Sequence, residues 1–302
     1  MGFQRQYLAV MAVGFLATLP AAAISAHTWV AGYGNDANPC SVTQPCASFT
    51  AAHNATSPGG VISVLSPGDF GAVTISKSIT IDGGAIGGSV TFTGGEGIYI
   101  AAGTSDTVIL RHLTVNGLNT GMDAIYLSQA RYLIIEDCDV EAFTSIGLGF
   151  QSQSAANVTV TNTRIIGGQL GVRTFQSSGL VPYDVISMRN VVVSGASSAA
   201  VFSRNGTMEI SDSLITQSAI GVEADTNAFI NVANSVISNN AIDEEFFPNT
   251  TGGIFVGTNN TLFGNNGLPG PPSGPAGVRP SPEVVIRTDS PLPPDALRPP
   301  RR

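Results

Sequence analysis

The sequence is poor in aromatic residues, charged residues and cysteine. Of its 302 residues only 7% are aromatic and 11% are charged, and it has one Trp, three Cys and three His. Aromatic rings are too scarce to fill a core, so its volume must come from Val, Ile, Ala and Leu, which favour strands bounded by tight turns. The 35 Gly residues and the 43% hydrophobic content predict a folded, all-β chain.

Beyond its N-terminus the sequence also lacks any run of about 18 apolar residues, the length that a membrane-spanning helix needs. Residues 1–26 have a basic start, an apolar run that ends at Leu19, and small residues that end in AAAISA. This layout predicts a secretory signal peptide cleaved after Ala23 or Ala26; an uncleaved membrane anchor is the alternative. We therefore expect a secreted, periplasmic or cell-surface protein without a membrane span after cleavage.

Three cysteines are too few for a disulfide framework. In an exported protein Cys40 and Cys46, which bracket a short loop in NPCSVTQPC, are predicted to form a disulfide, and Cys138 stands alone. A metal site is the alternative, but it lacks further Cys ligands and the His residues are scattered. We therefore predict no metal ligands.

The two ends of the chain differ from its middle in composition. Residues 264–302 hold 11 of the 18 Pro residues and are predicted to be a disordered tail. The tail and the signal segment together carry six of the 13 Lys and Arg residues and three of the 21 acidic ones, so residues 27–263 keep 7 basic and 18 acidic side chains, a net charge of −11. This acidity argues against nucleic acid as a partner.

A pattern of apolar, polar and small residues returns about every 22 to 28 residues. The copies are ILRHLTVNG, IIEDCDVEA, VTVTNTRIIGG, ISMRNVVVSG, MEISDSLITQS and INVANSVISNN. Period-two alternation on both sides of one polar residue predicts two short strands joined by a bend. The polar residues of the bends form one column: His112, Asp137, Asn162, Asn190, Asp212 and Asn234. A further strand that begins with Gly or Ala precedes each copy, as in GIYIA, AIYLS and GLGFQ.

Three short strands and three turns per repeat predict a parallel β-solenoid; a leucine-rich repeat would need a Leu and Asn signature that is missing. Residues 59–263 resemble the right-handed parallel β-helix, or pectin-lyase-like, superfamily. The resemblance implies that the bend column is an asparagine ladder, whose side chains bond to the turn and to neighbouring rungs. It also implies that residues 27–58 form an N-terminal cap with a short helix near residues 46–54.

Residues 134–141, IIEDCDVE, concentrate four carboxylates around one cysteine. The repeat places Cys138 in the core and Asp137 at the bend. The outward carboxylates lie one rung from arginines: Glu136 from Arg111, and Asp139 from Arg164. We interpret the stretch as one rung with surface ion pairs, rather than as a calcium or catalytic site.

The superfamily includes pectate and pectin lyases and polygalacturonases, so the fold alone does not supply an activity. Residues 27–263 contain neither the polygalacturonase-like set (Asn-Thr-Asp, Asp-Asp, Gly-His-Gly, Arg-Ile-Lys) nor the pectate-lyase-like Arg-x-Pro-x-x-Arg, which leaves catalysis open. The candidate catalytic carboxylates are Asp123, Glu223 and Asp225. No cofactor is predicted unless the protein is a lyase, where calcium could bridge the acidic body to a polyuronate.

The outward face of the strand before each copy is the predicted glycan-binding surface, because this sheet carries the substrate groove in the enzymes that the chain resembles. Aromatic rings can stack on sugars, while Arg and Glu can bond to hydroxyls. The middle outward positions are Tyr99, Tyr126, Gly149, Arg173, Phe202 and Glu223. The alternative is that these aromatic residues merely favour strands.

We therefore expect a protein that binds polysaccharide or cell-envelope glycan without catalysis. The alternatives are a polysaccharide lyase or glycoside hydrolase, favoured by the fold resemblance, and a structural or adhesive surface protein, favoured by the Pro-rich tail. The sequence specifies neither the glycan nor an oligomeric state.

Overall fold

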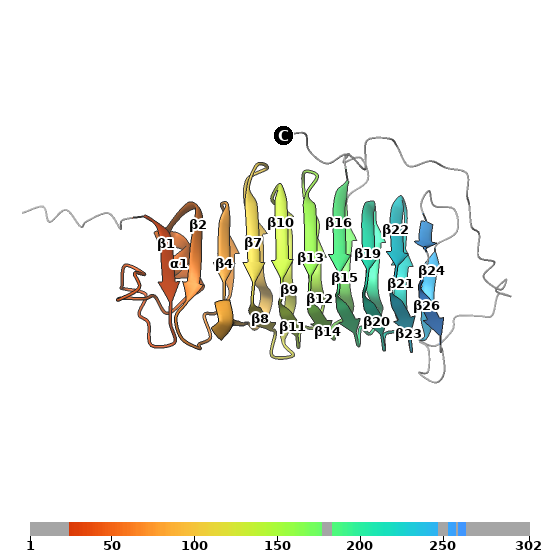
Figure 1. Ribbon diagram of the computed structural model, residues 1–302, viewed down its shortest axis with the longest axis horizontal. Helices are drawn as coiled ribbons and strands as arrows, with labels where there is room; N and C mark the ends of the chain where they lie inside the picture. The colour runs from red at the N-terminus through yellow and green to blue at the C-terminus, as the bar shows by residue number, and fades with distance from the viewer. Residues whose placement is uncertain (1–23, 177–182, 247–252, 258, 264–302) are drawn as a thin grey trace, which may run out of the picture.

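The computed structural model of the chain describes residues 24–176, 183–246, 253–257 and 259–263. These residues wind into an elongated solenoid, in which successive strands lie side by side in chain order along the long axis (Figure 1). All strand pairs within its sheets are parallel, as the register of neighbouring turns shows. The predicted parallel β-solenoid with three strands per turn is confirmed.

Three sheets, named A, B and C here, form the sides of the described solenoid. Sheet A contains β1 (Ser25–Val30), β2 (Thr56–Val64), β4 (Ile79–Asp82), β7 (Thr107–Arg111), β10 (Tyr132–Glu136), β13 (Asn157–Thr161), β16 (Asp184–Arg189), β19 (Gly206–Ser211), β22 (Ala228–Ala233) and β25 (Gly253–Val256). Sheet B contains β5 (Gly88–Thr91), β8 (Leu113–Asn116), β11 (Asp139–Glu141), β14 (Arg164–Ile166), β17 (Val192–Ser194), β20 (Leu214–Thr216), β23 (Val236–Ser238) and β26 (Thr261–Phe263). Sheet C contains β3 (Val73–Ile75), β6 (Gly94–Ala101), β9 (Gly121–Gln129), β12 (Ile146–Phe150), β15 (Leu170–Phe175), β18 (Ala199–Arg204), β21 (Ile220–Ala224) and β24 (Ile242–Phe246).

The bend from sheet A to sheet B is made by one residue in each of the six copies of the repeat. The residues predicted for this column have φ values between 50° and 55°, the left-handed region: His112, Asp137, Asn162, Asn190, Asp212 and Asn234. Asn and Asp tolerate this conformation better than other side chains, because their short polar groups bond locally. The bend therefore explains why the sequence repeats these residue types.

The core lies between the three sheets and is built from aliphatic columns. On sheet A the inward column of buried residues runs Leu110, Ile135, Val160, Met188, Ile210 and Val232. Cys138 joins the core just after the bend, where burial raises the pKa of its thiol to about 12. A thiol with so high a pKa has little thiolate at neutral pH, which fits an unreactive core residue.

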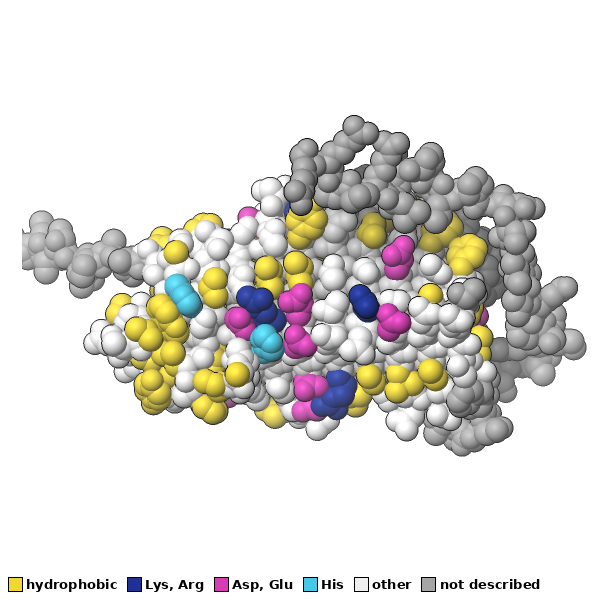
Figure 2. Space-filling view, in the orientation of Figure 1, with side chains coloured by type: hydrophobic (Ala, Val, Ile, Leu, Met, Phe, Trp, Pro, Cys, Tyr) yellow, Lys and Arg dark blue, Asp and Glu magenta, His cyan; other side chains and the backbone are white. Residues whose placement is uncertain are grey.

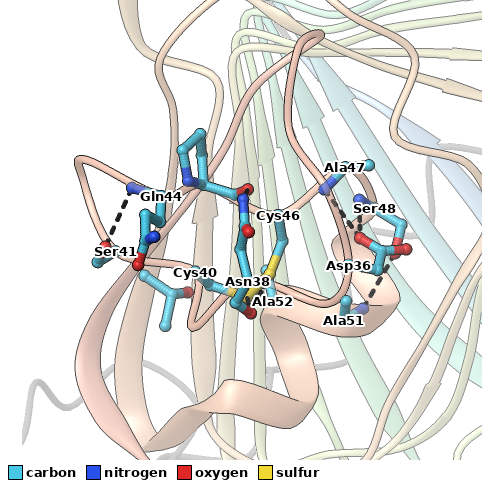
Figure 3. The surroundings of a disulfide bond; sticks show 12 residues. Asp36, Asn38, Cys40, Ser41, Gln44, Cys46, Ala47, Ser48, Ala51 and Ala52 are labelled. Atoms are coloured by element: carbon cyan, nitrogen blue, oxygen red, sulfur yellow. Dashed lines mark hydrogen bonds between the residues drawn. A yellow bond between two sulfur atoms is a disulfide. The ribbon is translucent and has the colours of Figure 1, made fainter.

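A short helix, α1 (Phe49–Ala55), and the loop before it cover the N-terminal end of the solenoid (Figure 1). Phe49 and Ala52 are fully buried against the core. Ser48 caps the helix, because its Oγ accepts the N–H of Ala51 at 3.1 Å, and it donates in turn to the carboxylate of Asp36 at 2.8 Å (Figure 3). A 3-10 helix, η1 (Gly84–Ile86), connects β4 to β5.

The predicted disulfide between Cys40 and Cys46 is confirmed (Figure 3). The side-chain amide of Asn38, just before the disulfide-closed loop, donates to the carbonyl of Pro45 at 2.8 Å. Cys46 also forms a β-bridge with Val30, so the disulfide ties the loop to the first strand of sheet A.

Two predicted boundaries fall inside strands. Strand β1 begins at Ser25, so cleavage after Ala26 would cut this strand, whereas cleavage after Ala23 would leave it whole. Strand β2 crosses the predicted boundary between residues 58 and 59, so the cap and the solenoid share sheet A. The remainder of the predicted signal peptide and the predicted tail, residues 264–302, lie outside the described residues.

Candidate functional site on sheet C

Each strand of sheet C begins at a corner that is filled by side chains of sheet B. A Cβ atom added to Gly171 would lie 2.3 Å from Cγ1 of Val193, and one added to Gly147 would lie 2.6 Å from Cγ2 of Ile165. A larger residue would collide with the core at these points, which explains why the strand segment before each copy begins with Gly or Ala. The corner fixes where each strand enters the sheet and therefore which side chains face outward.

One outward column crosses sheet C, two residues after the corner. Strand register aligns Tyr99, Tyr126, Gly149, Arg173, Phe202 and Glu223 in that order. The structure therefore places all the residues predicted for glycan binding in one line along the solenoid. Their surroundings divide the line into an aromatic part, a cationic part and an acidic part.

The aromatic part consists of two stacked tyrosines. The rings of Tyr99 and Tyr126 have centroids 6.0 Å apart and planes within 16° of parallel. The Tyr126 ring leans over Gly149 of the next strand, where an added Cβ would lie 2.9 Å from Cδ2, and its hydroxyl donates to Oε1 of Gln151 at 2.6 Å. Burial raises the pKa of the Tyr126 hydroxyl, which stays protonated and able to donate.

Two neighbouring hollows open along this part of sheet C, and Tyr99 lines both. The tyrosine hollow has a volume of about 360 Å³ and is lined by Tyr99, Tyr126, Ser128, Gln151, Ser152, Gln153 and Gln176. The cap hollow has a volume of about 440 Å³ and is lined by Thr50, His53, Asn54, Ala72, Val73, Thr74, Ser76, Glu96 and Tyr99. Together they extend from helix α1, across strands β3, β6 and β9, to the residues that follow strands β12 and β15.

The cationic part is fixed by aromatic and polar neighbours. Arg173 donates to Oε1 of Gln151 at 3.2 Å, and its guanidinium lies 5.6 Å from the ring centroid of Phe175. Arg204 lies 5.3 Å from the same ring and forms an ion pair with Asp225 at 2.7 Å. Phe175 therefore lies between two guanidiniums, an arrangement stabilised by cation–π attraction.

The acidic part contains Glu223, a candidate carboxyl group whose pKa is strongly shifted. Glu223 is 8% exposed, and burial, together with the charges of Glu245 and Asp225, raises its pKa to about 7. The other two candidate carboxylates are engaged: Asp123 accepts the N–H of Ile146 at 3.1 Å, and Asp225 holds Arg204. With a pKa of about 7, Glu223 can carry a proton near neutral pH.

Comparison with known proteins agrees with this architecture. Residues 63–185 match the family model described as a right handed beta helix region. This chain is a right-handed parallel β-helix. Among solved structures it is similar to the pectate lyase Pel9A, with 16% identity, a TM-score of 0.50, and coverage of 80% of this chain and 74% of that one. At this identity the similarity shows the fold alone. A search of curated proteins finds no match.

In the β-helix, the predicted bend column forms a partial hydrogen-bonded ladder. Asn190 donates to Asn162 at 2.8 Å, and Asn162 donates to Asp137 at 3.1 Å. His112 continues the series, with Nε2 at 3.7 Å from Asp137 and Nδ1 at 2.9 Å from Asp82. In Figure 2 the charged side chains gather over the middle of the drawn face, which carries the strands of sheet A in Figure 1.

The stretch IIEDCDVE contributes one rung of the β-helix, with one correction to its predicted ion pairs. Arg164 does bond to Asp139, at 2.7 Å, and it also reaches Glu141. Within the described part of the chain, however, Arg111 pairs with Asp82 at 3.0 Å rather than with Glu136. Both Asp82 and Glu136 flank Arg111 in register, but Asp82 also accepts from His112, so two side chains, Arg111 and His112, converge on it.

Sequence reasoning missed the polar lining of the tyrosine hollow. Gln151, Ser152, Gln153 and Gln176 follow the ends of strands β12 and β15, where the turns toward sheet A differ in length and show no repeat. The run QSQS at residues 151–154 was the available signal, because consecutive amides and hydroxyls are typical of polar recognition surfaces.

Among the described residues no group of three or more His, Cys, Asp or Glu side chains is arranged to hold a metal ion. The described residues also include no helix that is long and apolar enough to cross a membrane.

Proposed function

We propose that this β-helix is an exported protein that binds an extended glycan along the outward face of sheet C. The observation that carries the proposal is the tyrosine hollow, in which two stacked aromatic rings are surrounded by amides and hydroxyls. A shallow surface that repeats along a solenoid suits a ligand that is itself a chain of similar units. The disulfide supports export, because such bonds persist in oxidising compartments.

The chemistry of the hollow matches that of a sugar ring. The C–H faces of a pyranose are apolar and can pack on the outer face of Tyr126, while its hydroxyls point sideways toward the amides of Gln151, Gln153 and Gln176. The ring of Tyr126 is held by Gly149 below it and by Gln151 at its hydroxyl. Such a preorganised platform loses little conformational entropy on binding.

Replacing the platform tests the proposal. We expect Tyr126→Ala to weaken binding to the oligosaccharides that wild-type protein retains on a glycan array by about tenfold or more, a free-energy loss of about 1.4 kcal/mol. Tyr132→Ala is the matched control, because Tyr132 is 45% exposed but lies on sheet A. Unaltered binding by Tyr126→Ala, or an equal loss in the control, would contradict the proposed site.

Glu223 favours a second candidate function, glycan cleavage. A carboxyl group with a pKa of about 7 can act as a general acid near neutral pH. The experiment is incubation with neutral and uronate polysaccharides, with and without calcium, and a count of new reducing ends or unsaturated products. If cleavage occurs, Glu223→Gln should abolish it while Asp225→Asn, whose carboxylate is held by Arg204, should retain part of it.

A further inference from the structure

The charged side chains of sheet C are mostly carboxylates. Its strands contain six acidic residues, Glu96, Asp123, Glu223, Asp243, Glu244 and Glu245, and two basic residues, Arg173 and Arg204. Glu96 and Asp123 are neighbours in register on β6 and β9, the two strands that carry the stacked tyrosines. Burial contributes most to the raised pKa of the Tyr126 hydroxyl; the charge of Arg173 opposes the rise, and the charges of Asp123 and Glu96 add to it. A ligand in the tyrosine hollow therefore lies in the field of these two carboxylates.

Both guanidiniums of this sheet already have partners. Arg204 is neutralised by Asp225, and Arg173 donates to Gln151 while lying over the ring of Phe175. Arg173 must share the Oε1 atom of Gln151 with the hydroxyl of Tyr126, so its position is set from within the protein. One positive charge remains against the carboxylates of the face, which is too little to attract an anionic polymer.

The lining of the tyrosine hollow is uncharged. It consists of three glutamines, two serines and two tyrosines. Amides and hydroxyls each donate and accept hydrogen bonds, which matches sugar hydroxyls that do the same, whereas a carboxylate only accepts. A uronate in this hollow would bring a third negative charge toward Glu96 and Asp123, and Arg173, which bonds to the amide of Gln151 rather than to a carboxylate, would offset only part of that repulsion.

From this charge distribution we infer that the groove selects uncharged glycan segments and discriminates against polyuronates. The inference rests on the proposed glycan-binding function and names its ligand class. Discrimination comes from the repulsive carboxylates beside the hollow as much as from the neutral lining, in the way that specific sites use unfavourable contacts against the wrong ligand.

A matched pair of ligands tests the inference. Oligomers of polygalacturonate and the same oligomers after reduction of each carboxyl to an alcohol differ only at C6, where a charged acceptor becomes a neutral hydroxyl, and their binding to the full chain can be measured by calorimetry in EDTA. We expect the reduced form to bind at least about tenfold more tightly at about 0.01 M salt, with the ratio shrinking at about 0.3 M salt as screening increases.

The two possible failures are distinguishable. Equal or tighter binding of the polygalacturonate overturns the inference and leaves the glycan groove in place. Binding to neither form, nor to any neutral glucan, xylan or mannan oligomer, overturns the proposed function and the inference with it.

A charge-neutralising variant locates the effect. Glu96→Gln with Asp123→Asn should raise the affinity for polygalacturonate several-fold more than the affinity for the reduced form, and the Asn side chain can still accept the N–H of Ile146. Glu136→Gln with Glu209→Gln makes the same change in net charge on sheet A. If this control pair raises the polygalacturonate affinity equally, the discrimination comes from overall charge and the assignment to Glu96 and Asp123 is wrong.

Discussion

Gly149 determines whether the Tyr126 ring can lie over the next strand, and Gly149→Ala tests this directly. A Cβ at position 149 would lie 2.9 Å from Cδ2 and 3.3 Å from Cε2 of the ring. Carbon atoms in favourable contact lie about 3.5 to 4.0 Å apart, so the ring must move outward by about 0.6 Å or more. The hydrogen bond from its hydroxyl to Gln151, at 2.6 Å, would lengthen or break.

The cost can be worked from these contacts. Overpacking of this kind destabilises a protein by about 1 to 3 kcal/mol, and a lost hydrogen bond contributes about 1 kcal/mol within that range. Replacement of Gly by Ala also restricts the unfolded chain, which contributes about 0.4 to 1 kcal/mol in the opposite direction. We therefore expect Gly149→Ala to lower the free energy of unfolding by about 1 to 2 kcal/mol and to weaken glycan binding.

Urea denaturation measures the stability, and spectrophotometric titration of tyrosine measures the position of the ring without a ligand. In Gly149→Ala the raised pKa of Tyr126 should fall toward the ordinary value, because the hydroxyl becomes more exposed. Gly253→Ala is the control, since a Cβ at position 253 meets its nearest atom at 3.6 Å. Should both variants match in stability and tyrosine titration, the ring does not depend on Gly149 and our account of the platform is wrong.

Three further predictions concern stability, each measured by urea denaturation. The free energy of unfolding of the wild type should fall as the pH rises from about 4.5 to 7, because the folded state holds the Glu223 proton to about pH 7 while the unfolded state releases it near 4.5. Glu223→Gln should remove part of this fall, and the variant should be more stable than the wild type at pH 8 by at most about 3 kcal/mol. Asn162→Ala should cost about 2 to 3 kcal/mol through two ladder bonds and a left-handed φ, and Asn162→Gly about 1 kcal/mol less. Reduction of Cys40–Cys46 should cost about 2.4 kcal/mol. The three expectations would be contradicted, in turn, by an effect of Glu223→Gln that does not depend on pH, by equal losses in Asn162→Ala and Asn162→Gly, and by a free energy of unfolding that reductant does not change.

The fold could be predicted from the sequence because the bend from sheet A to sheet B needs one left-handed residue in each of the six copies of the repeat. That requirement selects Asn, Asp or His at the same position of every copy, which is visible as an aligned column in the sequence. The corner from sheet B to sheet C also uses left-handed residues, but it fills them with different types: Ala142, Gly167, Gly195, Gln217 and Asn239. Because the residue type at this corner differs from turn to turn, the corner leaves no repeated residue in the sequence and was not predicted.

The partner of Arg111 was not predicted, because the recognised repeat begins one rung too late along the chain. Asp82 belongs to the segment ITIDGG, one rung before the first copy that the alignment recognised, and it lies directly beside Arg111 in register. Glu136 lies on the other side of Arg111, so geometry alone allowed either partner. Asp82 also accepts from His112 and from the N–H of Gly84, and these bonds fix its carboxylate where Arg111 can reach it.

The inward and outward columns of sheet C differ in how strongly packing constrains their residue types. The inward column of sheet C stays apolar from Ile98 to Val222 and changes at Glu244, in the last described strand. The outward column beside it changes at almost every step, from tyrosine through glycine and arginine to glutamate. Packing restricts the inward column to apolar side chains, whereas exposure to solvent permits many kinds of side chain in the outward column. Outward side chains of sheet C are nevertheless ordered, with the Tyr126 ring on Gly149 and two guanidiniums near Phe175, and this order is why we propose this face as the ligand-binding one.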